Sequence, residues 1–305
     1  IMISNEVVGS GKYTYKPEYD WAKLPDGWSM PAAAVFGDSN DDVYCFNRDP
    51  DHRIMIFDKD GNYKNSWGGD EFTFPHAIWI DGEDNLWLTD RDNCQMYKYS
   101  KDGELLMTIG EKGYRSDTGA DNSKFDSNSW IKVTHAGEPF NMPSGIMKNA
   151  EGEIFISDGY ANCRVHAFSG AGDLKYSWGA PGSGPGEFHL PHGVWIDRKG
   201  RVLIADRENN RVQVFDQTGK WIKDWPTELI GAAVIYIDDE DIAYVCEHNS
   251  GQISVLTSEG ELLARWGDMS NKSCHGIWAD SNKDLYVVMP FEGSTGRTVV
   301  KYHRQ

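Results

Sequence analysis

The chain has 305 residues, of which 47 are acidic and 30 are basic, so its formal net charge at pH 7 is −17. This balance argues against nucleic acid or an anionic membrane surface as the main partner, because both reward a basic face. No run of about 18 apolar residues is present, so no membrane-spanning helix is expected. The first residues lack the basic and apolar regions of a signal peptide, which slightly favours a cytoplasmic location, although the compartment stays open.

Short strand-like segments separated by Gly, Asp and Asn turns run along nearly the whole chain. The first of them, residues 12–15, has strand character but no neighbouring partner in the sequence. Six copies of a longer pattern follow, in which an apolar strand, a polar turn and a second apolar strand succeed one another. These copies start at Ala33, His76, Ser144, His192, Ala233 and His275.

The second half of most copies has its own signature, a turn glycine followed six positions later by a large apolar residue. The pairs are Gly61 and Trp67, Gly103 and Ile109, Gly172 and Trp178, Gly219 and Trp225, and Gly260 and Trp266. Four short strands in a unit of about 40 residues are typical of a propeller blade. The chain is therefore predicted to be all-β, a six-bladed β-propeller that forms one domain over residues 1–305.

Two irregularities complete this prediction. The last copy ends at Tyr302 without a fourth strand, so we expect residues 12–15 to supply that outer strand and close the ring, which removes exposed sheet edges. The step between the second and third copies is longer than the others, and the surplus corresponds to about residues 113–138. Long ordered loops in compact domains are often functional, but a surface excursion without a role is the alternative.

The residue that opens each copy is histidine in the second, fourth and sixth copies and in no other. The first strand of a blade lines the central channel, and alternate blades are related by a third of a turn. His76, His192 and His275 are therefore expected to converge on the channel axis. Three neutral imidazoles with an open fourth position are typical of a catalytic zinc site, although Fe, Co, Ni or Mn would also fit. The alternative is that each His bonds only to a neighbouring main-chain group.

The end of the second strand in each blade should lie on the same rim. Arginine follows that strand at Arg48, Arg91 and Arg207, and Asp206 stands beside the last of them. We interpret these residues as binding an anionic small-molecule or peptide-like substrate, whose carboxylate arginine holds with two hydrogen bonds. The alternative is that each arginine pairs with a nearby acid and ties blades together.

The third copy differs by one extra turn residue, which places Tyr160 on this rim. A phenol beside a metal ion and arginines is a candidate general base. An ordinary aromatic residue filling a turn is the alternative.

These residues carry a family resemblance. The stretches FISDGYANCRVHAFSGAGDLKYSWG, GPGEFHLPHGVWID and LIADRENNRVQVF resemble the lyase domain of peptidylglycine α-amidating enzymes, which are six-bladed propellers of the NHL type. The resemblance extends from about residue 31 to 302. It implies zinc-dependent cleavage of an α-hydroxyglycine amide to an amide and glyoxylate. By the same resemblance the zinc ligands are His76, His192 and His275, the catalytic tyrosine is Tyr160, and the active-site arginines are Arg48 and Arg207.

The chain departs from that family around the last histidine. It has Ser273-Cys274-His275-Gly276 where the family has Met-Pro-His-Asp, so the Asp expected to help bind a structural calcium ion is missing. The main-chain carbonyls expected to join that Asp map to Val35 and Ile78. Calcium is therefore not expected to bind as it does in the family, and the substrate is expected to differ.

Two other functional readings stay open. A metal-dependent hydrolase of amides, esters or lactones would use the same three histidines. A non-catalytic propeller would bind a protein or peptide on one face. We expect a monomer, with a dimer as the alternative.

Overall fold

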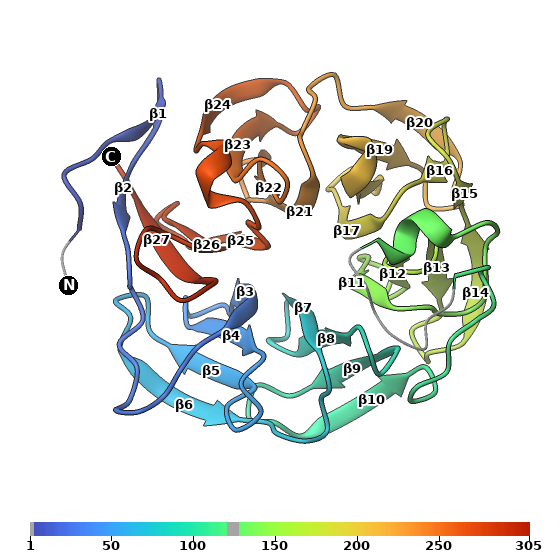
Figure 1. Ribbon diagram of the computed structural model, residues 1–305, viewed down its shortest axis with the longest axis horizontal. Helices are drawn as coiled ribbons and strands as arrows, with labels where there is room; N and C mark the ends of the chain where they lie inside the picture. Colours follow the sequence, from blue (N-terminus) through green and yellow to red (C-terminus); the bar gives the residue numbers. More distant parts are fainter. Residues whose placement is uncertain (1–2, 121–127) are drawn as a thin grey trace.

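The computed structural model describes residues 3–120 and 128–305. The described chain is almost entirely β-structure, arranged as six blades around a central channel, of which five have four strands and the sixth has five (Figure 1). Within these ranges no helix is long and apolar enough to cross a lipid bilayer. The predicted all-β, six-bladed architecture is confirmed.

The strands of each blade run from the channel outward and pair antiparallel with their neighbours. Blade 1 contains β3 (Ala32–Gly37), β4 (Val43–Asn47), β5 (Ile54–Phe57) and β6 (Tyr63–Trp67). Blade 2 contains β7 (Pro75–Ile80), β8 (Leu86–Asp90), β9 (Gln95–Tyr99) and β10 (Leu105–Ile109). Blade 3 contains β11 (Pro143–Lys148), β12 (Ile154–Asp158), β13 (Arg164–Phe168) and β14 (Leu174–Trp178).

The second half of the ring repeats this order. Blade 4 contains β17 (Pro191–Ile196), β18 (Val202–Asp206), β19 (Arg211–Phe215) and β20 (Trp221–Asp224). Blade 5 contains β21 (Ala232–Ile237), β22 (Ile242–Glu247), β23 (Gln252–Thr257) and β24 (Leu262–Trp266). Blade 6 contains β25 (Gly276–Ala279), β26 (Leu285–Met289) and β27 (Thr298–Arg304). The remaining elements are the short parallel pair β15 (Ala180–Pro181) and β16 (Glu187–Phe188), and the 3₁₀ turns η1 (Ser129–Lys132), η2 (Arg207–Asn209) and η3 (Met269–Asn271).

The ring is closed by the N-terminal part of the chain. Strand β2 (Tyr13–Glu18) pairs antiparallel with β27, with Tyr15 opposite Arg304, and so supplies the fourth strand of blade 6. Ring closure by the N-terminal part of the chain is confirmed, although residues 15–18, and not 12–15, form the pairing. A further strand, β1 (Val8–Ser10), pairs with the outer side of β2, which the repeat does not predict.

A turn glycine packs blades 2, 4 and 5 against the tryptophan of the preceding blade. Gly260, in the turn before β24, has φ +85°, and a Cβ atom there would lie 2.1 Å from Cγ of Trp225 in the blade before. Gly219 stands in the same relation to Trp178, with the nearest ring atoms at 2.6 Å. Only glycine adopts this backbone conformation at no steric cost and leaves room for the indole ring. The glycine–tryptophan signature of the sequence is therefore an interblade packing device.

The inner strands of blades 1–5 each have a β-bulge after their first residue. The register shifts by one residue at Ala33, His76, Ser144, His192 and Ala233, which are the residues that open the sequence copies. A β-bulge leaves one residue out of the strand pairing and re-aims its side chain. The bulge thus frees the carbonyl group of these residues and turns the histidines toward the channel.

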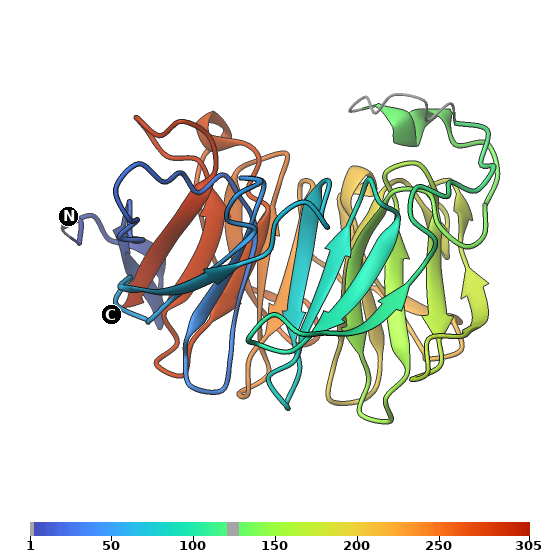
Figure 2. The same ribbon diagram turned by 90° about the horizontal axis from the view of Figure 1, so that it is seen from below.

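Aromatic rings fill the far end of the channel. Phe36 lies 5.7 Å from Tyr236 and 6.1 Å from Trp278, measured between ring centres. A narrow cavity of about 50 Å³ lies between these rings and the histidines. Residues of the inner strands of the blades line it. The histidines therefore lie at the end of the channel opposite these rings. The η1 turn and the loop before β27 rise from one face of the propeller (Figure 2).

Candidate metal centre

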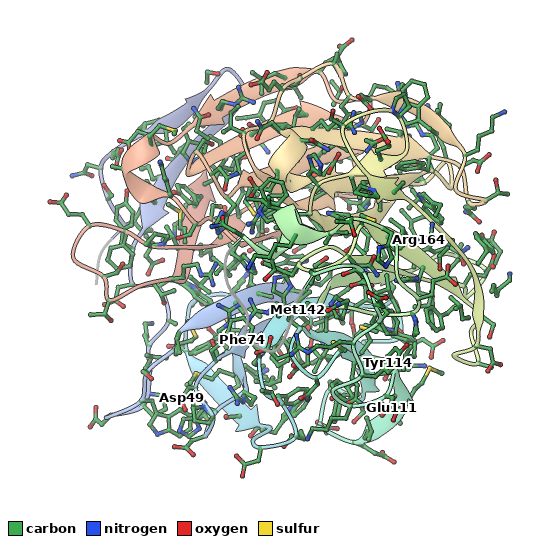
Figure 3. The ribbon with its side chains drawn as sticks, turned by 45° about the vertical axis from the view of Figure 1, so that its right-hand side comes forward. Asp49, Phe74, Glu111, Tyr114, Met142 and Arg164 are labelled. Atoms are coloured by element: carbon green, nitrogen blue, oxygen red, sulfur yellow. The ribbon has the colours of Figure 1, made fainter. Side chains whose placement is uncertain are left out.

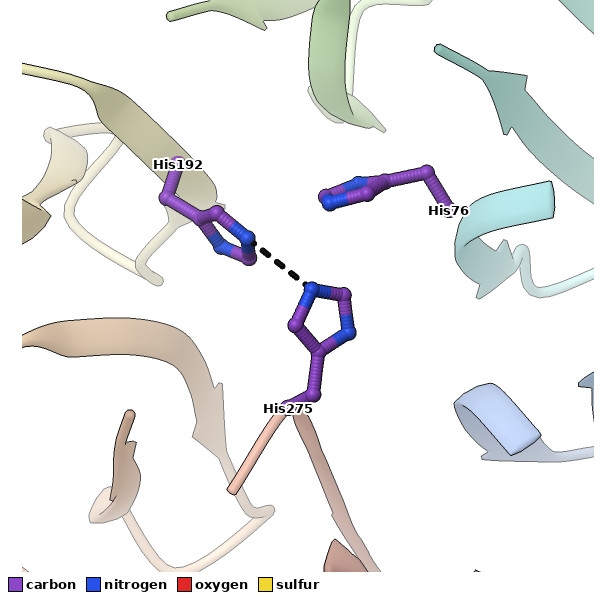
Figure 4. A group of neighbouring side chains, drawn as sticks. All are labelled: His76, His192 and His275. Carbon is purple, nitrogen blue, oxygen red and sulfur yellow. Dashed lines mark hydrogen bonds between the residues drawn. The ribbon is translucent and has the colours of Figure 1, made fainter. Parts of the chain in front are cut away.

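Three histidines from alternate blades meet at one end of the channel. His76 belongs to β7, His192 to β17, and His275 directly precedes β25. Their ligand atoms lie within 4.8 Å of one another, and each residue is at most 2% exposed. Figure 4 shows the three rings pointing inward from three sides of the channel. The convergence expected from the repeat is what the structure shows.

Each imidazole ring is fixed by the next blade around the ring. Its Nδ1 atom faces the free carbonyl oxygen of the residue at the equivalent bulge. The pairs are His76 with Ser144 at 2.6 Å, His192 with Ala233 at 2.8 Å, and His275 with Ala33 at 2.7 Å. A carbonyl oxygen only accepts hydrogen bonds, so Nδ1 carries the proton in every ring. The Nε2 atoms therefore keep lone pairs that point to the channel axis, as in a histidine ready to bind metal.

One pair of Nε2 atoms has the spacing expected around a single ion. Those of His192 and His275 lie 3.2 Å apart, and two lone pairs at this distance repel unless a cation lies between them. A proton is disfavoured, because burial lowers the pKa of both rings well below the usual value. Three nitrogens bound to one tetrahedral zinc ion lie about 3.3 Å apart, given bonds of about 2.0–2.1 Å. The residues present therefore fit a divalent metal ion.

Tyr160 lies directly beside this cluster. Its hydroxyl oxygen is 2.8 Å from Nε2 of His76 and 3.0 Å from Nε2 of His192. The preceding Gly159 allows this placement, because a Cβ atom there would lie 2.2 Å from the carbonyl oxygen of Pro191. The turn that carries the tyrosine is thus pressed against the strand that carries His192.

The long segment between blades 2 and 3 anchors the Tyr160 turn. The hydroxyl of Thr118 donates to the carbonyl of Ala161 at 2.8 Å, and Asn162 exchanges hydrogen bonds of 3.1 and 2.9 Å with the main chain of Gly137. Residues 121–127 of the predicted insertion 113–138 lie outside the described residues. The parts on either side of them hold the tyrosine turn in place.

The three predicted arginines gather around two aromatic rings. The guanidinium carbons of Arg48 and Arg91 lie 3.8 and 3.7 Å from the centre of the Phe74 ring, and Arg91 and Arg207 lie 5.1 and 5.6 Å from that of Tyr160. Phe74 lies toward the middle of the molecule in Figure 3, whereas Asp49 lies farther out. Cation–π contacts hold the guanidinium groups at the mouth of the channel.

Two of these arginines also pair with the acid that follows them. Arg91 lies 2.9 Å from Asp92, and Arg207 lies 3.0 Å from Glu208. Arg48 instead donates to the carbonyl of Pro75 at 3.1 Å, and it forms no ion pair with any described residue. Burial, followed by the positive charge of Arg297, lowers the pKa of Arg48. The mouth therefore carries positive charge that nearby acids do not balance.

The remaining predicted residues lie away from the cluster. Asp206 is fully buried, and its carboxylate accepts hydrogen bonds from Asn209, Arg211 and Gln213 within blade 4. Val35 and Ile78 line the narrow cavity behind the histidines. No Asp or Glu is among the described residues that line this cavity, so a calcium ion there would have only main-chain oxygens as ligands.

Arg297 is a site residue that the repeat does not reveal. It lies in the loop before β27, and after burial its charge is the strongest influence that lowers the pKa of His275. It forms no ion pair with any residue that the structure describes, and its carbonyl accepts from the main-chain N–H of Ala32 at 3.3 Å. The loop falls outside the repeating frame, in which the sixth copy offers only Met289 and Pro290 at this rim.

His248 also reaches the rim. Its ring centre lies 6.2 Å from that of His275, and burial lowers its pKa to about 4. Its Nδ1 atom lies 2.9 Å from the side-chain oxygen of Asn249, whose amide group in turn donates to Glu208. A neutral imidazole is thus linked to the acid that pairs with Arg207.

Comparison with known proteins agrees with this architecture. Residues 134–283 match a domain family described as a 6-bladed beta-propeller. The human NHL repeat-containing protein 3 is 29% identical over 262 residues, which are 81% of this chain and 71% of that protein. The peptidyl-alpha-hydroxyglycine alpha-amidating lyase 1 of Drosophila melanogaster is 30% identical over 187 residues, 56% of this chain and 30% of that protein. The resemblance stated from the sequence is confirmed.

Among solved structures, streptogramin B lyase aligns with 91% of this chain and 85% of its own chain. The TM-score is 0.58 and the sequence identity is 16%. At this identity the likeness concerns the fold alone, and the chemistry has to be argued from the residues of this chain.

Proposed function

We propose that this chain is a metal-dependent C–N lyase, which cleaves an N-acyl α-hydroxyglycine or related carbinolamide to an amide and glyoxylate or a similar aldehyde. The observation that carries the proposal is the meeting of three Nε2 lone pairs, the Tyr160 hydroxyl and the arginines at one channel mouth. The amidating lyase relative supports this reading, and it matches over only part of its own length.

The residues of the chain have distinct roles in this reaction. Arg48 and Arg207 hold the substrate carboxylate, which fixes the bond to be broken. Tyr160, as phenolate, takes the proton of the substrate hydroxyl. The electron pair left on that oxygen forms the C=O bond of the aldehyde, the C–N bond breaks, and the amide nitrogen takes up one proton. No water is consumed.

The three histidines would hold zinc or another divalent ion through Nε2. When bound, such an ion supplies Lewis acidity, which lowers the pKa of a hydroxyl group. The neighbouring main-chain carbonyls keep the rings in the tautomer that this role requires. Arg91, which lies between Phe74 and Tyr160, keeps the positive charge of the mouth close to the phenol.

Two other candidates are tested by the same experiment. A metal-dependent hydrolase would use the same histidines and consume water. A non-catalytic binding scaffold would fit the extensive match to NHL repeat-containing protein 3, whose name states no activity.

The test is product analysis with an N-acyl α-hydroxyglycine in heavy-oxygen water. We expect glyoxylate and the unlabelled acyl amide in equal amounts. The double variant His76→Ala/His192→Ala should release neither above the rate without protein. Formation of labelled acyl carboxylic acid would show that the chain is a hydrolase and not a lyase. If the metal-loaded protein forms neither the amide nor the acid, a non-catalytic binding scaffold is favoured.

A further inference from the structure

A second cavity opens beside the metal centre. This cleft of about 590 Å³ lies between residues 20–31 and the loop 291–298. Both segments lead into strands that begin at the histidine rim, since β3 starts at Ala32 and β27 at Thr298. The loop before β27 rises from the same face as η1 (Figure 2). The volume is within the range of small-molecule sites, about 300–1,000 Å³.

The cleft has an apolar part and a polar part. Leu24, Trp28, Met30, Pro31 and Phe291 form the apolar part. The indole of Trp28 is held rigid, because it stacks on His52 with ring centres 3.4 Å apart and meets the edge of Tyr63 at 5.4 Å. The hydroxyl groups of serine and threonine residues border these walls, and Asp20 is the one acid among the described lining residues. A rigid aromatic wall with few charges suits an uncharged apolar group.

The main chain connects this cleft directly to the metal centre. Pro31 lines the cleft, and its carbonyl accepts the main-chain N–H of Arg48 at 3.0 Å. Ala32 donates to Arg297, and the carbonyl of Ala33 fixes His275. At about 3.3 Å per residue of extended strand, Pro31 is only about 7 Å from Ala33. One short piece of chain thus touches the cleft, two arginines and a metal ligand.

Positive charge also connects the cleft with the channel mouth. Arg297 is among the residues that line the cleft, and its positive charge also lowers the pKa of Arg48. Its guanidinium has no acidic partner among the described residues. A molecule that extends from the metal centre into the cleft would therefore pair its anionic end with the arginines and bury its apolar end against Trp28.

We propose that this cleft binds the acyl group of the substrate, and that the substrate is a short N-acyl compound with an apolar acyl group, whose carboxylate Arg297 binds together with Arg48 and Arg207. This inference rests on the proposed lyase function and names its substrate class. Because the apolar part of the cleft is built on Trp28 and the one acid of the lining is accompanied by Arg297, the occupant is an aryl or alkyl acyl chain and not a basic peptide.

Binding of unreactive analogues tests the cleft without turnover. N-benzoylglycine and N-acetylglycine share the carboxylate end and differ in the acyl group, and neither has the hydroxyl that the reaction needs. By calorimetry with the metal-loaded protein, we expect N-benzoylglycine to bind at least tenfold more tightly. Trp28→Ala and Thr295→Trp should reduce this ratio to less than threefold, the first by removing a wall and the second by filling the cleft from an exposed loop position.

A matched control is Ser258→Trp, which adds the same indole at a half-buried turn position in blade 5, on the opposite rim. It should keep the wild-type ratio. Equal affinity of the two analogues, or a ratio unchanged in both cleft variants, would overturn the proposal and leave the cleft to another occupant, such as a longer peptide. Tight and selective binding without glyoxylate release from the hydroxylated substrates would instead refute the lyase function while supporting the cleft.

Discussion

His275 and Ala33 lie 242 positions apart in the chain, yet Nδ1 of His275 is 2.7 Å from the carbonyl oxygen of Ala33. This contact joins blade 6 to blade 1 across the seam of the ring, and β2, which precedes blade 1 in the chain, pairs with β27 of blade 6 to close the ring. The seam is therefore held both by an outer strand and by an inner hydrogen bond that orients a metal ligand. Metal binding and closure of the propeller should be linked, because a ligand that binds only the folded state stabilises it.

Removing the metal should lower the thermal stability. At a metal concentration of about 100 times Kd the ion adds about 2.7 kcal/mol to the free energy of unfolding. For a chain of this length that corresponds to a fall in Tm of about 5 °C on chelation. Calorimetry of the metal-loaded and chelator-treated protein, with metal content measured by plasma mass spectrometry, checks this. The variant His76→Ala/His192→Ala should carry no ion and show no response to the chelator; equal responses of both proteins would contradict a tri-histidine site.

Tyr160→Phe should reduce kcat about 10²–10⁴-fold, because the variant lacks the oxygen that lies 2.8 Å from His76 and takes the substrate proton. Metal content should stay at the wild-type level, since the three Nε2 atoms remain. Tyr114→Phe, at a position that is 45% exposed, serves as the control and should retain full activity. Steady-state turnover at saturating substrate measures this effect. Full activity of Tyr160→Phe would show that the tyrosine does not take the substrate proton.

The repeat predicts much of this site because a propeller has a fixed internal frame. Once the copies are aligned, the bulge position and the end of the second strand are equivalent in every blade. His76, Tyr160 and Arg207 could therefore be brought together from the sequence alone. Asp206 shows the limit of that reasoning, since the residue next to Arg207 in sequence points into its blade and satisfies its carboxylate there.

The parts that could not be predicted lie outside the frame. Arg297 belongs to a loop with no counterpart in the other copies, and a loop's path is set by its local turns and contacts. The cleft is formed by two segments at opposite ends of the chain, and only ring closure brings residues 20–31 beside 291–298. The bulges that free the carbonyls of Ser144, Ala233 and Ala33 leave no signature in the pattern of apolar residues.

Arg48→Met should lower kcat/KM for substrates that carry a carboxylate and leave kcat/KM for uncharged analogues unchanged. A hydrogen bond to a charged group contributes about 1.5–3 kcal/mol, which predicts a loss of about 10–100-fold in kcat/KM for the α-hydroxyglycine substrate. For the matching carboxamide, whose end is neutral, the variant and the wild type should agree within about twofold. An equal loss with both substrates would indicate that Arg48 supports the fold through Phe74 and Pro75 and does not bind the anion.

The packing of glycine against tryptophan between blades can be separated from glycine's backbone freedom by two alanine substitutions. Gly260 and Gly152 have nearly the same φ, +85° and +92°, but a Cβ atom at Gly152 meets nothing within 4 Å, whereas at Gly260 it would lie 2.1 Å from the Trp225 ring. Gly152→Ala should cost about 1–2 kcal/mol of unfolding free energy, the cost of a left-handed conformation. Gly260→Ala should cost about 1–3 kcal/mol more, because the buried indole has to move. Urea unfolding of the two variants beside the wild type measures both, and equal losses would mean that the repeated glycine is retained for its backbone conformation alone.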